Sequence, residues 1–247
     1  MKIKPFLKTC ALAFGITTFS YASDTTRTIS SETIQNAAYI KMISKPNSSS
    51  NFEQFMKDGA QLIRQTEPNT VFWFALKKGH QFAIFDVFFN IKGREQHFAG
   101  QVANALKKNA SQFVQSGWEE GVLQNISNFD IIASNHFIKD KVLTSKEASY
   151  ITIKAKPGKN RDLELFFKEA SRLIDKTEPQ TYFWVALKIN KDSYAIFDVF
   201  PDKAAQQKHF SNRVASELQK NAENLIVGGW EKGIVANIHN FQIIAVS

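Results

Sequence analysis

Two aspartates stand in the middle of otherwise apolar segments, and a histidine follows each of them at the same distance. Asp86 lies within AIFDVF and Asp198 within an identical copy of that segment, while His97 and His209 come 11 residues later. A carboxyl group among apolar side chains has a raised pKa and can act as a base. A histidine can accept a proton or stabilise a developing oxyanion. These four residues are the candidate catalytic groups, and the alternative is a structural acid with a surface histidine.

Aromatic residues accompany the acids along the same predicted strands. Phe85 and Phe197 directly precede the aspartates, and Trp73 and Trp184 lie in the strand before each of them. Such rings could stack on a flat aromatic ligand. These four residues are candidate substrate-binding groups, and ordinary core packing is the alternative.

The composition excludes several other kinds of chemistry. The chain has 247 residues, a formal net charge of +8 and a single cysteine, Cys10. One cysteine cannot build a cysteine-rich zinc site, and the sequence predicts neither a metal nor a cofactor. Scattered lysines and arginines argue against nucleic-acid binding, and no apolar run reaches the roughly 20 residues of a membrane span.

The first 22 residues have the pattern of an export signal. A basic start with Lys2, Lys4 and Lys8 precedes a short apolar stretch, and small residues end at Ala22. This layout is typical of a cleaved signal peptide. The sequence therefore predicts a periplasmic or secreted protein.

The rest of the chain consists of two copies of one sequence unit. TEPNTVFWFALK at 66–77 recurs as TEPQTYFWVALK at 177–188, and NFDIIA at 128–133 recurs as NFQIIA at 240–245. These repeats divide the chain into a signal peptide (1–22), a polar lead-in (23–37), domain one (38–134), a linker (135–148) and domain two (149–247). Each unit is too long to be a solenoid repeat, so two homologous domains are expected.

Each unit has the same predicted order of elements. In domain one these are a strand at 39–44, a helix whose apolar stripe covers 52–63, strands at 70–77 and 81–89, a helix at 92–108 and a strand at 128–133. On that second helix, the wheel puts His97 on the polar flank beside Arg94 and Gln101. His239 and His80 have no counterpart in the other copy and are assigned to the surface.

The order β-α-β-β-α-β predicts an α+β fold, the ferredoxin-like arrangement with helices on one face of a sheet. Both faces of AIFDVF are mostly apolar, so the face without helices also needs a cover. The second copy can supply it, which predicts two tandem domains packed sheet to sheet as a fused pseudo-dimer with an aromatic interior. Further homodimerisation stays open.

Two segments share one motif: FAIFDVFFNIKGREQHFAGQVANAL at 82–106 and YAIFDVFPDKAAQQKHFSNRVASEL at 194–218. In this motif the chain resembles the antibiotic biosynthesis monooxygenase family of dimeric α+β barrels. The resemblance implies a cofactor-independent monooxygenase that uses dioxygen on a quinol-like or phenolic molecule, with Arg94 of the motif among the substrate-binding residues. Domain two carries Ala205, Gln206 and Asn212 where domain one has Gly93, Arg94 and Gly100, so domain one is the better candidate for a site.

Two classes of function therefore remain. The first is an enzyme that binds an apolar or aromatic small molecule in the barrel interior. The second is a non-catalytic periplasmic protein that binds a small molecule or has a structural role. A cavity reached by Asp86, His97 or Arg94 would favour the enzyme, whereas an interior filled by side chains would favour the structural role.

Overall fold

The computed structural model describes residues 34–247, and the segment 1–22 predicted to be a signal peptide lies outside them. In the part of the chain that is described, no helix is both long and apolar enough to cross a membrane.

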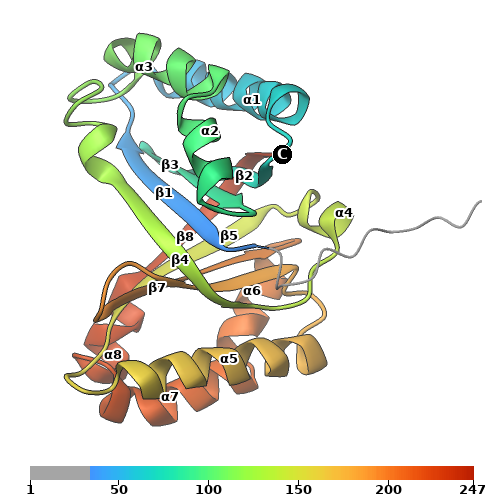
Figure 1. The fold of residues 1–247 in the computed structure, drawn as a ribbon, viewed down its shortest axis with the longest axis vertical. Coiled ribbons are helices and arrows are strands. Elements are labelled where there is room, and N and C mark those ends of the chain that lie inside the picture. The colour runs from blue at the N-terminus through green and yellow to red at the C-terminus, as the bar shows by residue number, and fades with distance from the viewer. Residues whose placement is uncertain (1–33) are drawn as a thin grey trace, which may run out of the picture.

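Each domain has the predicted order of strands and helices (Figure 1). Domain one consists of β1 (Asn36–Ile43), α1 (Ser49–Thr66), β2 (Thr70–Lys78), β3 (Gln81–Phe88), α2 (Ile91–Phe98), α3 (Gln101–Phe113), the 3-10 helix η2 (Leu123–Asn125) and β4 (Ile126–Ser134). After α4 (Lys139–Val142) in the linker, domain two consists of β5 (Glu147–Lys154), α5 (Asn160–Thr177), β6 (Phe183–Lys188), β7 (Ser193–Phe200), α6 (Lys203–Ser211), α7 (Arg213–Leu225), α8 (Gly229–Gly233), η3 (Val235–Asn237) and β8 (Ile238–Val246).

The helix predicted at 92–108 is in fact two helices, α2 and α3. The chain turns sharply between them, because Gly100 has an extended conformation (ψ 177°) and caps α3. Asn212 makes the same break in domain two (ψ 179°). The start of domain one also differs, since β1 begins at Asn36, within the segment predicted to be a polar lead-in.

The eight strands form one closed barrel in the order β1-β3-β2-β8-β5-β7-β6-β4. The last strand of each domain pairs with the other domain as well as its own, β4 with β6 and β8 with β2. Each strand therefore lies across the barrel from its counterpart, and the pseudo-twofold axis coincides with the barrel axis. The helices of the two domains cover opposite outer sides of this barrel (Figure 1). The predicted fused pseudo-dimer is confirmed, with continuous hydrogen bonding where two separate sheets were expected.

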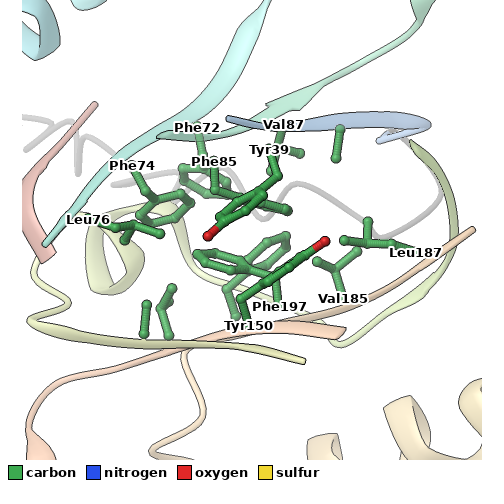
Figure 2. Packing of buried hydrophobic residues seen from close by; sticks show 14 of the residues in the cluster. Tyr39, Phe72, Phe74, Leu76, Phe85, Val87, Tyr150, Val185, Leu187 and Phe197 are labelled. Carbon is green, nitrogen blue, oxygen red and sulfur yellow. The ribbon is translucent and has the colours of Figure 1, made fainter. Parts of the chain in front are cut away.

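Aromatic rings fill the barrel interior (Figure 2). Phe85 stacks on Phe197 with ring centroids 3.7 Å apart, and Tyr39 stacks on Tyr150 with centroids 4.1 Å apart. Each stack joins one ring from each domain and leaves no room for a third ring between its members. The structure therefore shows no space for a substrate between Phe85 and Phe197, and their contact with a substrate stays a prediction.

The linker closes one end of the barrel. The ring of Phe137 packs edge-on against Phe72 and Phe183, with centroid distances of 5.3 and 5.2 Å, and Val142 of α4 is fully buried nearby. The linker thus contributes to the core.

Trp73 and Trp184 lie on the opposite face of the sheet from the interior rings. Each belongs to the apolar core between the barrel and the helices of its own domain. Trp73 lies against α1, because a Cβ at Gly59 would meet its ring at 3.6 Å, an ordinary van der Waals distance. Because side chains alternate along a strand, Trp73 faces α1 while Phe72 faces the interior. Both tryptophans thus pack in these cores, which was the alternative to stacking on a ligand, and neither faces the barrel interior.

Candidate functional site

Asp86 faces the helix layer of domain one. Its neighbours Phe85 and Val87 point into the barrel, so alternation along β3 turns Asp86 toward α2. The side chain is fully buried, and neither carboxyl oxygen has a hydrogen-bond partner. Burial raises the pKa of Asp86 to about 7, with Glu67 adding to that effect and the charge of His97 opposing it.

His97 lies between two carboxyl groups. Its Nδ1 is 2.6 Å from Oε2 of Glu67, and its Nε2 is 3.5 Å from Oδ2 of Asp86. Burial opposes the charged imidazole, but the charge of Asp86 and the hydrogen bond with Glu67 outweigh it and raise the pKa of His97. The prediction that His97 lies on a polar flank is wrong, because the break at Gly100 separates α2 from the apolar stripe of α3.

Glu67 is the residue of this site that sequence reasoning missed. It belongs to the Thr-Glu-Pro segment that ends α1, and its side chain is about nine-tenths buried. Its Oε2 accepts from His97 and from the Thr70 hydroxyl, whereas its Oε1 has no partner. The sequence does carry a signal for it, since Thr-Glu-Pro recurs in domain two and places a carboxyl group at the same position of both copies.

Domain two has the same three groups. His209 lies 2.5 Å from Oε2 of Glu178 through Nδ1 and 3.4 Å from Oδ2 of Asp198 through Nε2. Burial raises the pKa of Asp198 to about 6 against the charge of His209. The hydrogen bond with Glu178 and the charge of Asp198 raise the pKa of His209, although burial acts in the opposite direction.

The two sites differ in the space beside them. In domain one, a pocket of about 380 Å³ lies between the end of α1 and the junction of α2 with α3. We call it the Glu67 pocket, and its lining is Thr66, Glu67, Pro68, Asn69, Thr70, Gly93, Gln96, His97, Gly100 and Gln101. The matching space in domain two measures about 10 Å³. Of these two matching spaces, the one in domain one is large enough for a small molecule and the one in domain two is not.

Two glycines keep the Glu67 pocket open. A Cβ at Gly93 would come within 3.0 Å of the Asn69 carbonyl oxygen, and one at Gly100 within 2.5 Å of Oε1 of Glu67. Domain two carries Ala205 and Asn212 at these positions, and both line its small cavity. The difference in volume follows from the larger side chains.

Arg94 takes no part in the Glu67 pocket. It is half-exposed, does not line the pocket and forms no side-chain hydrogen bond or ion pair with any described residue. Its counterpart Gln206 is buried and donates to the Ser149 hydroxyl at 3.0 Å and the Ala148 carbonyl at 3.1 Å. The predicted substrate contact by Arg94 stays a prediction.

The acids and histidines make stability depend on pH. Carboxyl groups with raised pKa values, about 7 for Asp86 and about 6 for Asp198, keep protons in the folded chain that the unfolded chain releases near pH 4. The free energy of unfolding therefore falls as pH rises from about 4 to 7. His97 and His209, whose pKa values are also raised, extend the fall above about pH 6.5.

Urea unfolding between pH 4.5 and 8 should show a loss on the order of 1 kcal/mol per pH unit. Asp86→Asn should flatten part of this slope. Replacing the exposed Ile91, which carries no titratable group, with alanine should leave it unchanged. A stability that rises with pH across this window would contradict the arrangement.

Within residues 34–247, no group of three or more His, Cys, Asp or Glu side chains has the arrangement of a metal site. What the site can do is move a proton, since an unpartnered carboxylate oxygen beside a pocket is backed by an imidazole and a second carboxyl group.

Comparison with known proteins shows the fold. No family model and no curated protein matches the chain. Two solved structures, each named "putative monooxygenase", align with TM-scores of 0.70 (Fusobacterium nucleatum) and 0.67 (Lactobacillus acidophilus). Their identities are 13% and 11%, over 87% and 86% of this chain and 94% and 96% of theirs. An "anthrone oxidase-like protein" aligns with a TM-score of 0.57 and 7% identity, over 88% of this chain and 94% of its own. In all three, a single chain matches most of both domains.

Proposed function

We propose that the chain is a cofactor-independent monooxygenase that oxidises a phenolic or quinol-like small molecule in the Glu67 pocket. The observation that carries this proposal is the unpartnered Oε1 of Glu67 beside a cavity of about 380 Å³. Three structures with the same fold, two named "putative monooxygenase" and one named "anthrone oxidase-like protein", support the same class of reaction.

Glu67 is the proposed base that contacts the substrate. Both ring nitrogens of His97 already face carboxyl groups, so the imidazole is not free to take a proton from the substrate directly. An unpaired buried acceptor is unfavourable by about 1–3 kcal/mol, which favours a ligand whose hydroxyl donates to Oε1. His97 and Asp86 are positioning residues. They lie behind Glu67, as seen from the substrate, and share with it the proton that it takes up.

The proposed reaction needs only the substrate and dioxygen. Glu67 removes the hydroxyl proton of the phenol, and a ring carbon of the resulting anion forms a bond to dioxygen. The peroxide oxygen takes up a proton, and removal of the hydrogen on that carbon breaks the O–O bond and releases water. A phenol and dioxygen thus give a quinone and water, with dioxygen as the oxidant. A partly enclosed pocket restricts water around the anion.

Export is a further part of the proposal. It is supported by the basic start and short apolar stretch of residues 1–22. The reaction suits that location because it requires no cofactor supplied from the cytoplasm.

Closing the Glu67 pocket with the residues of domain two tests the proposal. The double variant Gly93→Ala/Gly100→Asn should raise the KM for 1-naphthol or anthrone at least tenfold in oxygen-uptake assays, because both side chains enter the pocket. The reciprocal Ala205→Gly/Asn212→Gly should leave the wild-type KM unchanged at the domain-one site. If neither probe is oxidised by the wild-type protein, or if the closed variant matches it, the enzyme is ruled out for these substrates.

The second candidate is a non-catalytic periplasmic protein, and one observation favours it. The barrel interior is filled by its own rings, so the fold needs no interior ligand to be complete. Binding of 1-naphthol in the Glu67 pocket without oxygen uptake would support this candidate.

A further inference from the structure

The barrel interior changes character at the end opposite the linker. Lys41, Gln81 and His239 each lie two residues along a strand from an interior-facing core residue, namely Tyr39, Ala83 and Phe241. Because side chains alternate, the three also face the barrel axis. Lys78, Ser127 and Thr152 are related in the same way to Leu76, Phe129 and Tyr150. The apolar interior therefore ends in a polar, cationic layer.

A pocket of about 310 Å³ lies at this end, and we call it the axial pocket. The stacked rings of Tyr39 and Tyr150 close it toward the interior. Its lining is Tyr39, Lys41, Gln81, Gln124, Asn125, Ser127, Tyr150, Thr152 and His239. It is separate from the Glu67 pocket, with which it shares no residue.

The axial pocket lies on the pseudo-twofold axis. Tyr39 is paired with Ser127 across β1 and β4, and Tyr150 is paired with His239 across β5 and β8 in the same register. Lys41 likewise corresponds to Thr152, two residues after each tyrosine. At each of these two positions, one domain supplies a cationic or basic side chain where the other has a neutral hydroxyl.

The positive charge of the axial pocket is not balanced by an acidic residue in its lining. Neither Asp nor Glu is among the residues that line the pocket. Burial and the charges of Lys78 and Lys41 lower the pKa of His239. Neither Lys41 nor Lys78 forms an ion pair with an acidic residue in the part of the chain that the structure describes. A concave surface with unbalanced positive charge attracts anions.

We propose that the axial pocket binds a small organic anion, with its carboxylate or phosphate group between Lys41 and His239. Lys78 adds charge, and the amide of Gln124 is in the lining, where it can donate a hydrogen bond, whereas the amide of Asn125 already donates one to the Glu120 carbonyl. The buried tyrosine hydroxyls stay protonated, since burial raises the pKa of both well above its usual value.

The test uses benzoate, inorganic phosphate and the neutral benzamide as probes on the full protein. Calorimetry should detect binding of benzoate or phosphate and none of benzamide. Which of the two anions binds shows whether the site takes a carboxylate or a phosphate group. NMR titration of His239 should show that the bound anion raises its pKa. Lys41→Thr and His239→Ser should each weaken binding about tenfold, roughly the loss of one charged hydrogen bond.

These two substitutions install the residue that the other domain carries, so the fold should accept them, which thermal unfolding can verify. Thr152→Lys should instead tighten binding. Glu67→Gln should leave anion binding unchanged, which separates this site from the proposed reaction. Binding of neither anion, equal binding of benzamide, or full binding by the Lys41→Thr/His239→Ser variant would overturn the proposal.

Discussion

Glu67→Gln is expected to lower the rate of oxygen uptake with 1-naphthol or anthrone by about 10²–10⁴-fold, the usual contribution of a general base. Glutamine keeps the size of the side chain but cannot accept the substrate proton. The bond from Nδ1 of His97 can still be accepted by the amide oxygen, so the fold should survive. The variant tests the catalytic role directly, because Glu67 is the only one of the three groups with an unpartnered oxygen beside the pocket among the residues described.

Domain two supplies the matched control. Glu178 makes the same bond to His209 and is even more deeply buried, but it has only about 10 Å³ of space beside it. Glu178→Gln should therefore perturb stability in the same way while leaving oxygen uptake within about twofold of wild type. Equal losses in both variants would mean that the effect of Glu67→Gln is structural. Unchanged activity in Glu67→Gln would remove Glu67 from the reaction.

Phe85→Ala is expected to destabilise the protein by about 3–5 kcal/mol, which lowers the melting temperature by roughly 10 °C. The ring is fully buried, stacks on Phe197 and contacts Phe74. Its removal leaves a cavity at the centre of the barrel, where both domains meet. Urea unfolding of the variant, compared with wild type, measures the loss.

A substitution at a surface position is the control for this loss of stability. Ile91 is 53% exposed, so Ile91→Ala should change stability by less than about 0.5 kcal/mol. The double variant Phe85→Ala/Phe197→Ala should cost less than the sum of the single variants, because they remove one shared contact. A loss below about 1 kcal/mol in Phe85→Ala would indicate an interior that is not packed as described.

The sequence predicted the architecture well because its signals are repeated. The two copies of AIFDVF, with apolar residues on both faces, require a cover for the second face, and only the other copy can provide it. What the pattern could not reveal is that β4 and β8 pair across the domain boundary, because alternation is the same whichever strand lies alongside.

The site was harder to predict, and each error has a physical cause. A helical wheel for 92–108 assumed one continuous helix, whereas the turn at Gly100 gives α2 its own orientation and buries His97. The sequence did not reveal the role of Glu67, because a glutamate that precedes a proline ordinarily marks only the end of a helix. The absence of a counterpart indicated a surface position for His239, whereas this residue lines the axial pocket, in register with Ser127 of domain one.

The most direct test of the central claim is the location of a bound phenol, determined by a crystal structure of the protein with 1-naphthol under anaerobic conditions. The account predicts the ring in the Glu67 pocket of domain one, with its hydroxyl within hydrogen-bond distance of Oε1 of Glu67 and no ligand beside Glu178. A phenol between Phe85 and Phe197, or one bound beside Glu178, would contradict it.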